Sequence, residues 1–294
     1  MYDTILLPVD GSPGAEGAIA NALAFARETD ATVHALSVIE TLADLEEFDP
    51  DQRAAVRRAS GNRAEEATGE VAATAEEVGV EVLEEVREGR PDRAILEYAE
   101  EVGADLIAMG TRGLTAAQSI RLGSTTERVI ARAEVPVLSV RLSDPEAPPT
   151  LEDVSIDRIL VPTDGSDAAE RAADRALEFA ESVGATVHVV YVLDRTIYDL
   201  EDAPKSIIGM LREGGQSAIE DVALEAEDRG LSVTRDLLRG VPEMEILEYA
   251  DGVDADLIAM GTRGRGGGGG SDRLLGSTTG RVVRRSKRPV LKTK

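Results

Sequence analysis

The chain contains two nearly identical stretches, and this internal repeat limits the possible folds more than any other feature. Residues 95–99 and 104–113 read ILEYA and ADLIAMGTRG, and residues 246–250 and 255–264 repeat both strings letter for letter. Each copy is followed by a Gly-Ser-Thr triplet. A repeat period of about 150 residues is typical of duplicated domains and not of a solenoid built from short units.

Each half of the chain alternates short apolar runs with helical stretches. This alternation predicts parallel strands joined by right-handed crossovers, so we expect two tandem α/β domains, each a doubly wound parallel sheet of five strands. The predicted strands cover residues 4–9, 31–39, 80–86, 105–109 and 135–140 in the first half, and 158–162, 186–193, 233–238, 257–260 and 289–291 in the second. Segments 41–49 and 195–215 are predicted as loops that lead into the second helix of each half.

The proline-rich segment 143–153 is the predicted linker between the halves. It contains Pro145, Pro148 and Pro149. We therefore expect a first domain over residues 1–142 and a second over residues 154–294. Because the linker is short, the two domains are expected to pack on each other.

The charge of the chain is strongly acidic. The formal net charge is −24 with a pI near 4.5, which argues against nonspecific binding to DNA, RNA or anionic lipid. Among the 32 basic residues, lysine occurs only at Lys205, Lys287, Lys292 and Lys294. An acidic, lysine-poor composition favours a halophilic protein, since salt at 1 M shortens the reach of charge repulsion to about 3 Å.

Other sequence features exclude several classes. The absence of cysteine excludes disulfides, thiolate nucleophiles and cysteine-ligated metals. No apolar run approaches the ~18 residues of a membrane span, and the start of the chain lacks the basic region of a signal peptide. We therefore expect a cytoplasmic protein.

A spaced set of glycines follows the predicted strand 105–109. Gly110 and Gly113 are separated by two residues, and nine more precede Gly123, Ser124 and Thr125. A strand end without a side chain leaves room for a ligand at the carboxyl edge of the sheet, and Gly113 permits a positive φ. Amides at a helix start bind anions, so Ser124 and Thr125 are candidate phosphate ligands.

These residues, together with residues 8–12 and 37–40, closely resemble the ATP-binding branch of the universal stress protein family, once in each half. The resemblance implies an adenine nucleotide alpha hydrolase-like fold and a cofactor that is ATP or AMP, with Mg²⁺ on the phosphates left open. It assigns the first site to Pro8, Val9, Asp10, Val38, Met109, Gly110, Arg112, Gly113, Gly123, Ser124 and Thr125. In this assignment Asp10 contacts adenosine and Val38 the adenine, while Met109 and Gly110 line the ribose and α-phosphate. For Arg112, contact with phosphate and contact with solvent stay equally open.

The second half carries the corresponding set but departs from the family pattern in one loop. Eleven residues instead of nine separate Gly264 from Gly276, and they include five consecutive glycines. Ordering this loop costs more conformational entropy, which predicts weaker nucleotide binding or ordering only upon binding. The assigned residues are Pro162, Thr163, Asp164, Val192, Met260, Gly261, Arg263, Gly264, Gly276, Ser277 and Thr278. Neither half has the Gly-Lys-Ser/Thr of a P-loop, so a P-loop motor or GTPase is not expected.

Two weaker signals have plain structural interpretations. The two histidines, His34 and His188, occupy equivalent strand positions and are interpreted as packed residues and not as metal ligands or proton carriers. The basic residues between Arg281 and Arg288 are interpreted as cations that favour the end of a helix, in preference to a nucleic-acid patch.

Three functions are compatible with these features. We favour a nucleotide-binding regulatory protein of the stress response over a slow ATPase and over a structural stress protein that binds no nucleotide. No residue is assigned as catalytic or metal-binding. The resemblance also implies that strands 135–140 and 289–291 pair within one chain as a pseudo-dimer, while a further homodimer stays open.

Overall fold

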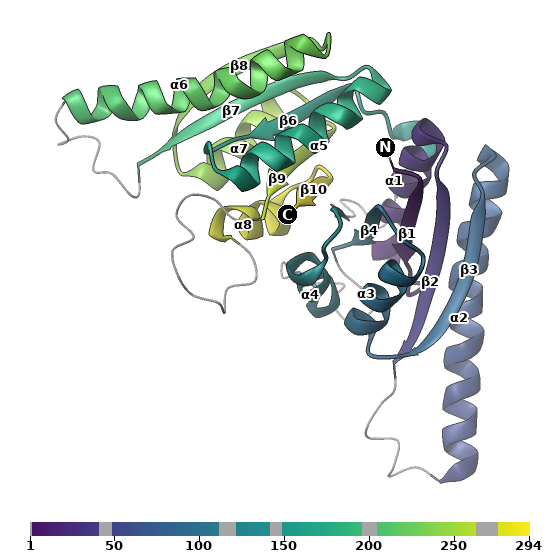
Figure 1. Ribbon diagram of the computed structural model, residues 1–294. Helices are drawn as coiled ribbons and strands as arrows, with labels where there is room; N and C mark the ends of the chain where they lie inside the picture. Colours follow the sequence, from purple (N-terminus) through teal and green to yellow (C-terminus); the bar gives the residue numbers. More distant parts are fainter. Residues whose placement is uncertain (1, 41–48, 112–121, 142–148, 196–204, 263–275) are drawn as a thin grey trace. The chain divides into compact units, whose positions relative to one another are not determined.

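The computed structural model describes residues 2–40, 49–111, 122–141, 149–195, 205–262 and 276–294. These residues form two compact units, which cover Tyr2–Val154 and Ser155–Lys294 (Figure 1). Residues 143–148 of the predicted linker lie outside the described residues, and Leu151–Asp153 forms a single turn of 3-10 helix. The exact domain and linker boundaries stay a prediction.

The N-terminal unit is a five-stranded parallel sheet with the strand order β3-β2-β1-β4-β5. Its strands are β1 Thr4–Pro8, β2 Thr32–Glu40, β3 Val82–Gly89, β4 Leu106–Gly110 and β5 Val137–Val140. Its helices are α1 Pro13–Thr29, α2 Pro50–Val78, α3 Pro91–Glu101 and α4 Ser124–Arg132.

The C-terminal unit repeats this architecture with the order β10-β9-β6-β7-β8, again all parallel. Its strands are β6 Arg158–Pro162, β7 Thr186–Asp194, β8 Val233–Gly240, β9 Leu257–Gly261 and β10 Val290–Thr293. Its helices are α5 Asp167–Val183, α6 Lys205–Asp228, α7 Pro242–Gly252 and α8 Ser277–Arg285. The predicted fold class, two doubly wound α/β domains of five strands each, is confirmed.

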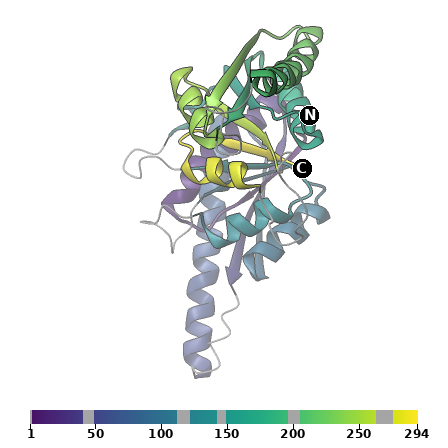
Figure 2. The ribbon, with the colours of Figure 1, turned by 90° about the vertical axis from the view of Figure 1, so that its left-hand side faces the viewer.

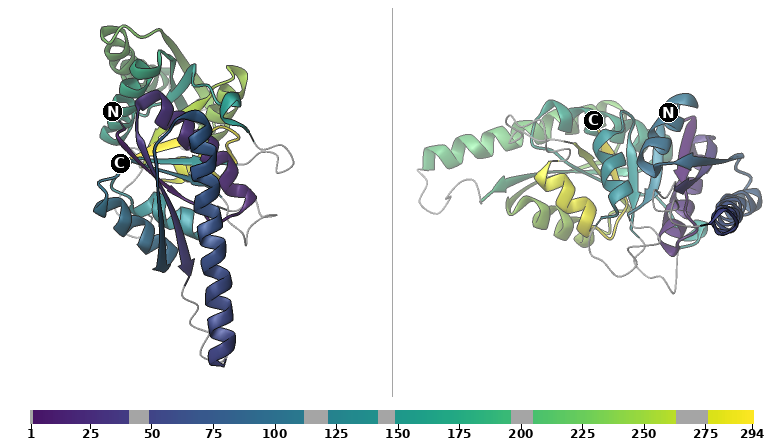
Figure 3. Two further views of the ribbon diagram at one scale, coloured as in Figure 1. Left: turned by 90° about the vertical axis from the view of Figure 1, so that its right-hand side faces the viewer. Right: turned by 90° about the horizontal axis from the view of Figure 1, so that it is seen from below.

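Helices cover both faces of each sheet. In the N-terminal unit α1 packs on β4 and β1 and α2 packs on β2 and β3, while α3 and α4 contact each other on the opposite face (Figure 3). Covering both faces explains why β1 and β4 are continuous apolar runs; Leu6 and Ile107 are completely buried. The strand order reverses between β1 and β4, and at such a switch point the connections leave on opposite faces of the sheet.

The prediction of a loop over 195–215 is wrong for residues 205–215, which belong to α6. Gly214 and Gly215 lower the helix propensity of this stretch, but tertiary packing outweighs propensity. A Cβ at Gly215 would lie 2.8 Å from Cδ1 of Tyr191 and 2.9 Å from Cδ1 of Leu237, so the missing side chain lets α6 lie close against β7 and β8. Residues 41–48 and 196–204 lie outside the described part of the chain.

The two histidines pair with tyrosines, in agreement with the packed-residue interpretation. His34 Nδ1 lies 3.0 Å from the Tyr98 hydroxyl, and His188 Nδ1 lies 3.2 Å from that of Tyr249. Tyr249 also donates to Asp236 at 2.6 Å, so its oxygen can only accept from His188. Burial lowers the pKa of both histidines, although nearby carboxylates oppose this effect.

Within the described residues, no helix combines the length and apolarity that a bilayer span needs.

Gly261, at the end of β9, generates a first prediction. A Cβ there would lie 2.5 Å from the Ala168 carbonyl oxygen at the start of α5. We expect Gly261→Ala to lower the free energy of unfolding by about 1–3 kcal/mol, measured by urea denaturation, because the backbone of α5 must move. Gly252→Ala, at a site with no atom within 4 Å of the new Cβ, is the control and should leave stability unchanged or slightly raised. Equal losses in both variants would contradict this packing role.

The lowered histidine pKa values predict a pH dependence of stability. Below the unfolded-state pKa of about 6.5 the unfolded chain binds more protons than the folded one, so the free energy of unfolding should fall as the pH drops toward the folded-state values. Urea denaturation between about pH 7.5 and pH 5.5 measures this loss. The double variant His34→Gln, His188→Gln should lose less over the same range. A variant with the same pH slope as the natural protein would show that the histidines are not responsible.

Candidate functional site

The first part of the site is the turn that joins β1 to α1. The N–H of Val9 donates to the Leu36 carbonyl at 2.8 Å, which carries the pairing with β2 one residue past Pro8. Asp10 Oδ1 then accepts from the N–H of Ser12 at 3.1 Å, and Gly11 has φ +66°, a conformation that favours glycine. The turn therefore holds Asp10 at the carboxyl edge of the sheet.

The C-terminal unit builds the same turn with one difference in its serine. Ser166 N–H donates to Asp164 Oδ1 at 3.1 Å, and the Ser166 hydroxyl donates to the same oxygen at 2.6 Å and accepts from Ala169 N–H at 3.3 Å. The Ser12 side chain is only 5% exposed, and its hydroxyl has no hydrogen-bond partner among the described residues. An unsatisfied buried hydroxyl costs about 1–3 kcal/mol, a cost that a bound polar group would remove.

The second part of the site is the start of α4, which hydrogen bonds fix beside the end of β4. Thr126 Oγ1 donates to the Gly110 carbonyl at 2.9 Å, and Gly123 N–H donates to the Thr111 carbonyl at 2.9 Å. In the C-terminal unit Thr279 Oγ1 donates to the Gly261 carbonyl at 2.8 Å, and Gly276 N–H donates to Thr262. None of these threonines is among the residues assigned from the sequence. In each half one of them follows the Gly-Ser-Thr triplet and the other follows the glycine that ends the strand.

These bonds change the expected role of Gly123. Its N–H is already engaged, so the amides left for an anion are those of Ser124 and Thr125, because the first turn of a helix has no intrahelical acceptors for them. Its φ of −61° suits any residue, so what glycine contributes here is the absence of a side chain. Gly261 also has a packing role, because its missing side chain leaves room for the backbone at the start of α5.

The strands on either side of β1 bring the remaining described site residues to the same edge. Val38 lies near the end of β2 and pairs in register with Arg87, and Met109 lies one residue before the end of β4. Val192 and Met260 take the corresponding places in β7 and β9. Pro8 and Pro162 end β1 and β6, and Thr163 donates its N–H to the Val190 carbonyl. The assigned residues Arg112, Gly113, Arg263 and Gly264 lie outside the described residues.

A buried acid joins α3 to α4 and helps to orient the candidate anion-binding helix. The Asp92 side chain, 2% exposed, lies 3.2 Å from Arg90, 3.7 Å from Arg128 and 3.2 Å from Arg132. In the C-terminal unit the buried Glu243 pairs with Arg281 of α8 at 3.1 Å.

The basic residues after Arg281 lie at the end of α8 and just beyond it. Arg284 and Arg285 occupy the last turn of α8, in agreement with the helix-end interpretation. Arg288 lies 3.8 Å from Asp251 and 3.3 Å from Asp254.

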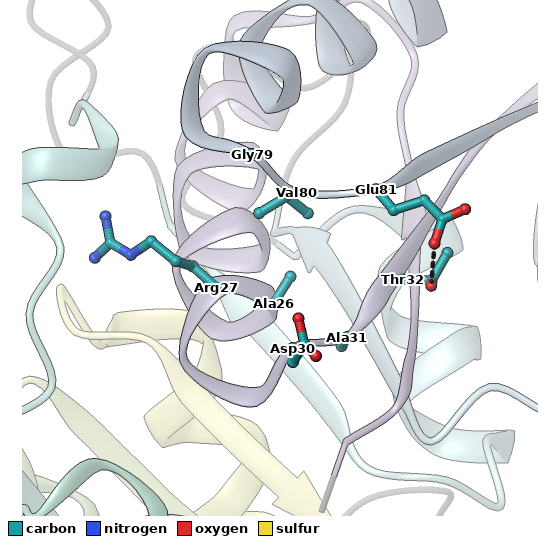
Figure 4. Close-up of a pocket in the computed structure, with 8 residues that line it drawn as sticks. All are labelled: Ala26, Arg27, Asp30, Ala31, Thr32, Gly79, Val80 and Glu81. Atoms are coloured by element: carbon teal, nitrogen blue, oxygen red, sulfur yellow. Dashed lines mark hydrogen bonds between the residues drawn. The ribbon is translucent and has the colours of Figure 1, made fainter.

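One pocket of about 240 Å³ lies at the other edge of the N-terminal sheet, where β2 and β3 begin (Figure 4). Asp30, Val80 and Glu81 are among its lining residues, and Thr32 donates to Glu81 at 3.2 Å. It contains none of the assigned site residues. Within the described parts of the chain, no group of three or more histidines and acids is arranged to hold a metal ion.

The universal stress protein family matches residues 1–141 and again residues 155–294. Universal stress protein MJ0531 of Methanocaldococcus jannaschii is 39% identical over 141 residues, which cover 47% of this chain and 81% of that protein. A universal stress protein of Thermus aquaticus is 40% identical over 141 residues, or 48% of this chain and all of its own. The crystal structure of a universal stress protein from Archaeoglobus fulgidus DSM 4304 is 27% identical, covers 99% of this chain and 96% of that one, and has a TM-score of 0.73. The chain therefore belongs to the universal stress protein family and carries the family's domain twice.

Proposed function

We propose that this protein binds an adenine nucleotide, ATP or AMP, at the carboxyl edge of the sheet in each unit and acts as a regulator in the stress response. The observation that carries the proposal is the pairing of two elements at the switch point between β1 and β4: the Asp10–Ser12 turn and the N-terminus of α4. Open α/β sheets bind ligands where the strand order reverses.

The chemistry of the two elements suits the two ends of a nucleotide. Free amides and hydroxyls of Ser124 and Thr125 at a positive helix end favour phosphate oxygens. The Asp10 carboxylate accepts hydrogen bonds, which suits ribose hydroxyls, and Val38 offers an apolar surface to a base. Mg²⁺, if it accompanies the nucleotide, would bind through the phosphates, as it does in many nucleotide sites.

The C-terminal unit offers the same donors, with Ser277 and Thr278 in the first turn of α8. Its loop of eleven residues between Gly264 and Gly276 is expected to weaken binding there. The regulatory role follows the family. Pairing of the two domains through their last strands, and any homodimer, remain predictions from the resemblance.

Release of a bound ligand tests the proposal directly. Mass spectrometry of the small molecules freed from purified, heat-denatured protein should detect ATP or AMP. Gly123→Val should remove nucleotide from the N-terminal unit only, because the backbone there accepts valine while the side chain blocks a phosphate; circular dichroism should show an unchanged fold.

Gly276→Val is the matched variant, since Gly276 has nearly the same backbone angles (φ −59°, ψ 148°), and it should empty only the C-terminal unit. Unchanged occupancy in Gly123→Val would contradict the site assignment. A natural protein that releases no nucleotide and binds no added ATP would contradict the function itself.

We also propose that the protein works in concentrated salt, which its net charge of −24 and its lysine-poor composition support. Raising KCl from about 0.1 M to 1 M shortens the Debye length from about 10 Å to 3 Å and should relieve repulsion in the folded state. The melting temperature, measured by differential scanning calorimetry, should therefore rise with KCl. A melting temperature that stays constant or falls as KCl rises would contradict the proposal that the protein works in concentrated salt.

A further inference from the structure

We propose that Arg63 of α2 binds a nucleotide phosphate in the N-terminal unit and that the C-terminal unit, with Gly214 at the equivalent position, lacks this contact. The two sites then differ in how strongly they prefer charged nucleotides to the nucleoside. This inference rests on the proposed function and deepens it, since no residue of α2 is among those assigned to either site from the sequence.

Arg63 lies directly over the Asp10–Ser12 turn. Its Nε is 3.6 Å, and its Cγ 4.0 Å, from the position that a Cβ would take at Gly11. The contact is made as α2 passes the end of β1, with Ala67 one turn later also 3.6 Å from that position. The first turns of α2, before Arg63, continue past the sheet as an exposed helix (Figure 2).

The guanidinium of Arg63 is available for a ligand. Arg63 is exposed and has no ion-pair or hydrogen-bond partner in the described part of the chain, whereas Arg57 on the same helix lies 3.5 Å from Glu88. Arg53 and Arg58 of the same helix also have no described ion-pair partner, so the feature that sets Arg63 apart is its place over the Asp10–Ser12 turn. A guanidinium binds phosphate oxygens through two parallel N–H donors, and the Ser12 hydroxyl in the same turn also lacks a described partner.

The C-terminal unit provides a natural comparison. The helices α2 and α6 align through the glycines that follow them, Gly79 and Gly230, and this alignment sets Gly214 opposite Arg63. A Cβ at Gly214 would meet no atom within 4 Å, so a side chain can leave the helix at this position. The turn at Asp164 therefore has the same backbone as the turn at Asp10 but no cation from the covering helix at this position.

The test measures nucleotide binding by each unit of the full chain separately. The probe is 8-azido-ATP, cross-linked by light over a range of concentrations, with labelled peptides assigned to the N-terminal or C-terminal unit by mass spectrometry. Adenosine and ATP serve as competitors. The variants are Arg63→Gln, Gly214→Arg and, as control, Arg53→Gln, which makes the same charge change on the same helix about 15 Å away.

Arg63→Gln should weaken labelling of the N-terminal unit about tenfold, as expected for loss of a charge-assisted hydrogen bond, and leave competition by adenosine unchanged. The difference in N-terminal labelling between Arg63→Gln and the natural protein should shrink in 1 M KCl. Labelling of the C-terminal unit should not change, and Gly214→Arg should strengthen it. Arg53→Gln should match the natural protein.

Two results would overturn the inference while leaving the proposed function in place: equal labelling of the N-terminal unit in Arg63→Gln and the natural protein, or an equal loss in Arg53→Gln. A loss of adenosine competition that equals the loss of ATP binding would also overturn it, because the contact would then not involve phosphate. A natural protein that takes no label in either unit would refute the proposed function, and this inference with it.

Discussion

The reversal of strand order between β1 and β4 is the constraint on which the candidate site depends. Right-handed crossovers send β1 and β2 onward through helices on one face of the sheet, and β3 and β4 through helices on the other. The chain therefore leaves β1 and β4 in opposite directions, and the starts of α1 and α4 flank the carboxyl ends of two adjacent strands. The C-terminal unit meets the same constraint at β6 and β9.

Two hydrogen bonds fix the start of α4 at this edge of the sheet. The Thr126 hydroxyl on the Gly110 carbonyl and the Gly123 amide on the Thr111 carbonyl tie the start of α4 to the strand that precedes it. Asp92, buried between three arginines, holds α4 to α3 from the other side. The unpaired amides of α4 are thereby presented at the sheet edge without any side chain reaching across it from Gly123.

Duplication has preserved this frame while individual side chains have diverged. Ser166 completes its hydrogen bonds within its own turn, whereas the buried Ser12 hydroxyl has no described partner. The tyrosine pair differs too: Tyr249 donates to Asp236, whereas Glu85, the equivalent carboxylate, lies 3.0 Å from Arg87. Such differences on a shared backbone let each unit serve as the internal control for the other.

Local patterns in the sequence were sufficient to predict the strands, the order of elements and the residues at the sheet edge, because buried apolar runs, helix caps and glycine spacings act over a few residues. Three features needed the tertiary structure: the close packing of α6 at Gly215, the engaged amide of Gly123, and Arg63 over Gly11. Each depends on a contact between residues that are not neighbours in the chain. A sequence pattern records which residues prefer a turn, a strand or a helix, but only the packed structure decides which backbone groups and which cation meet at one edge.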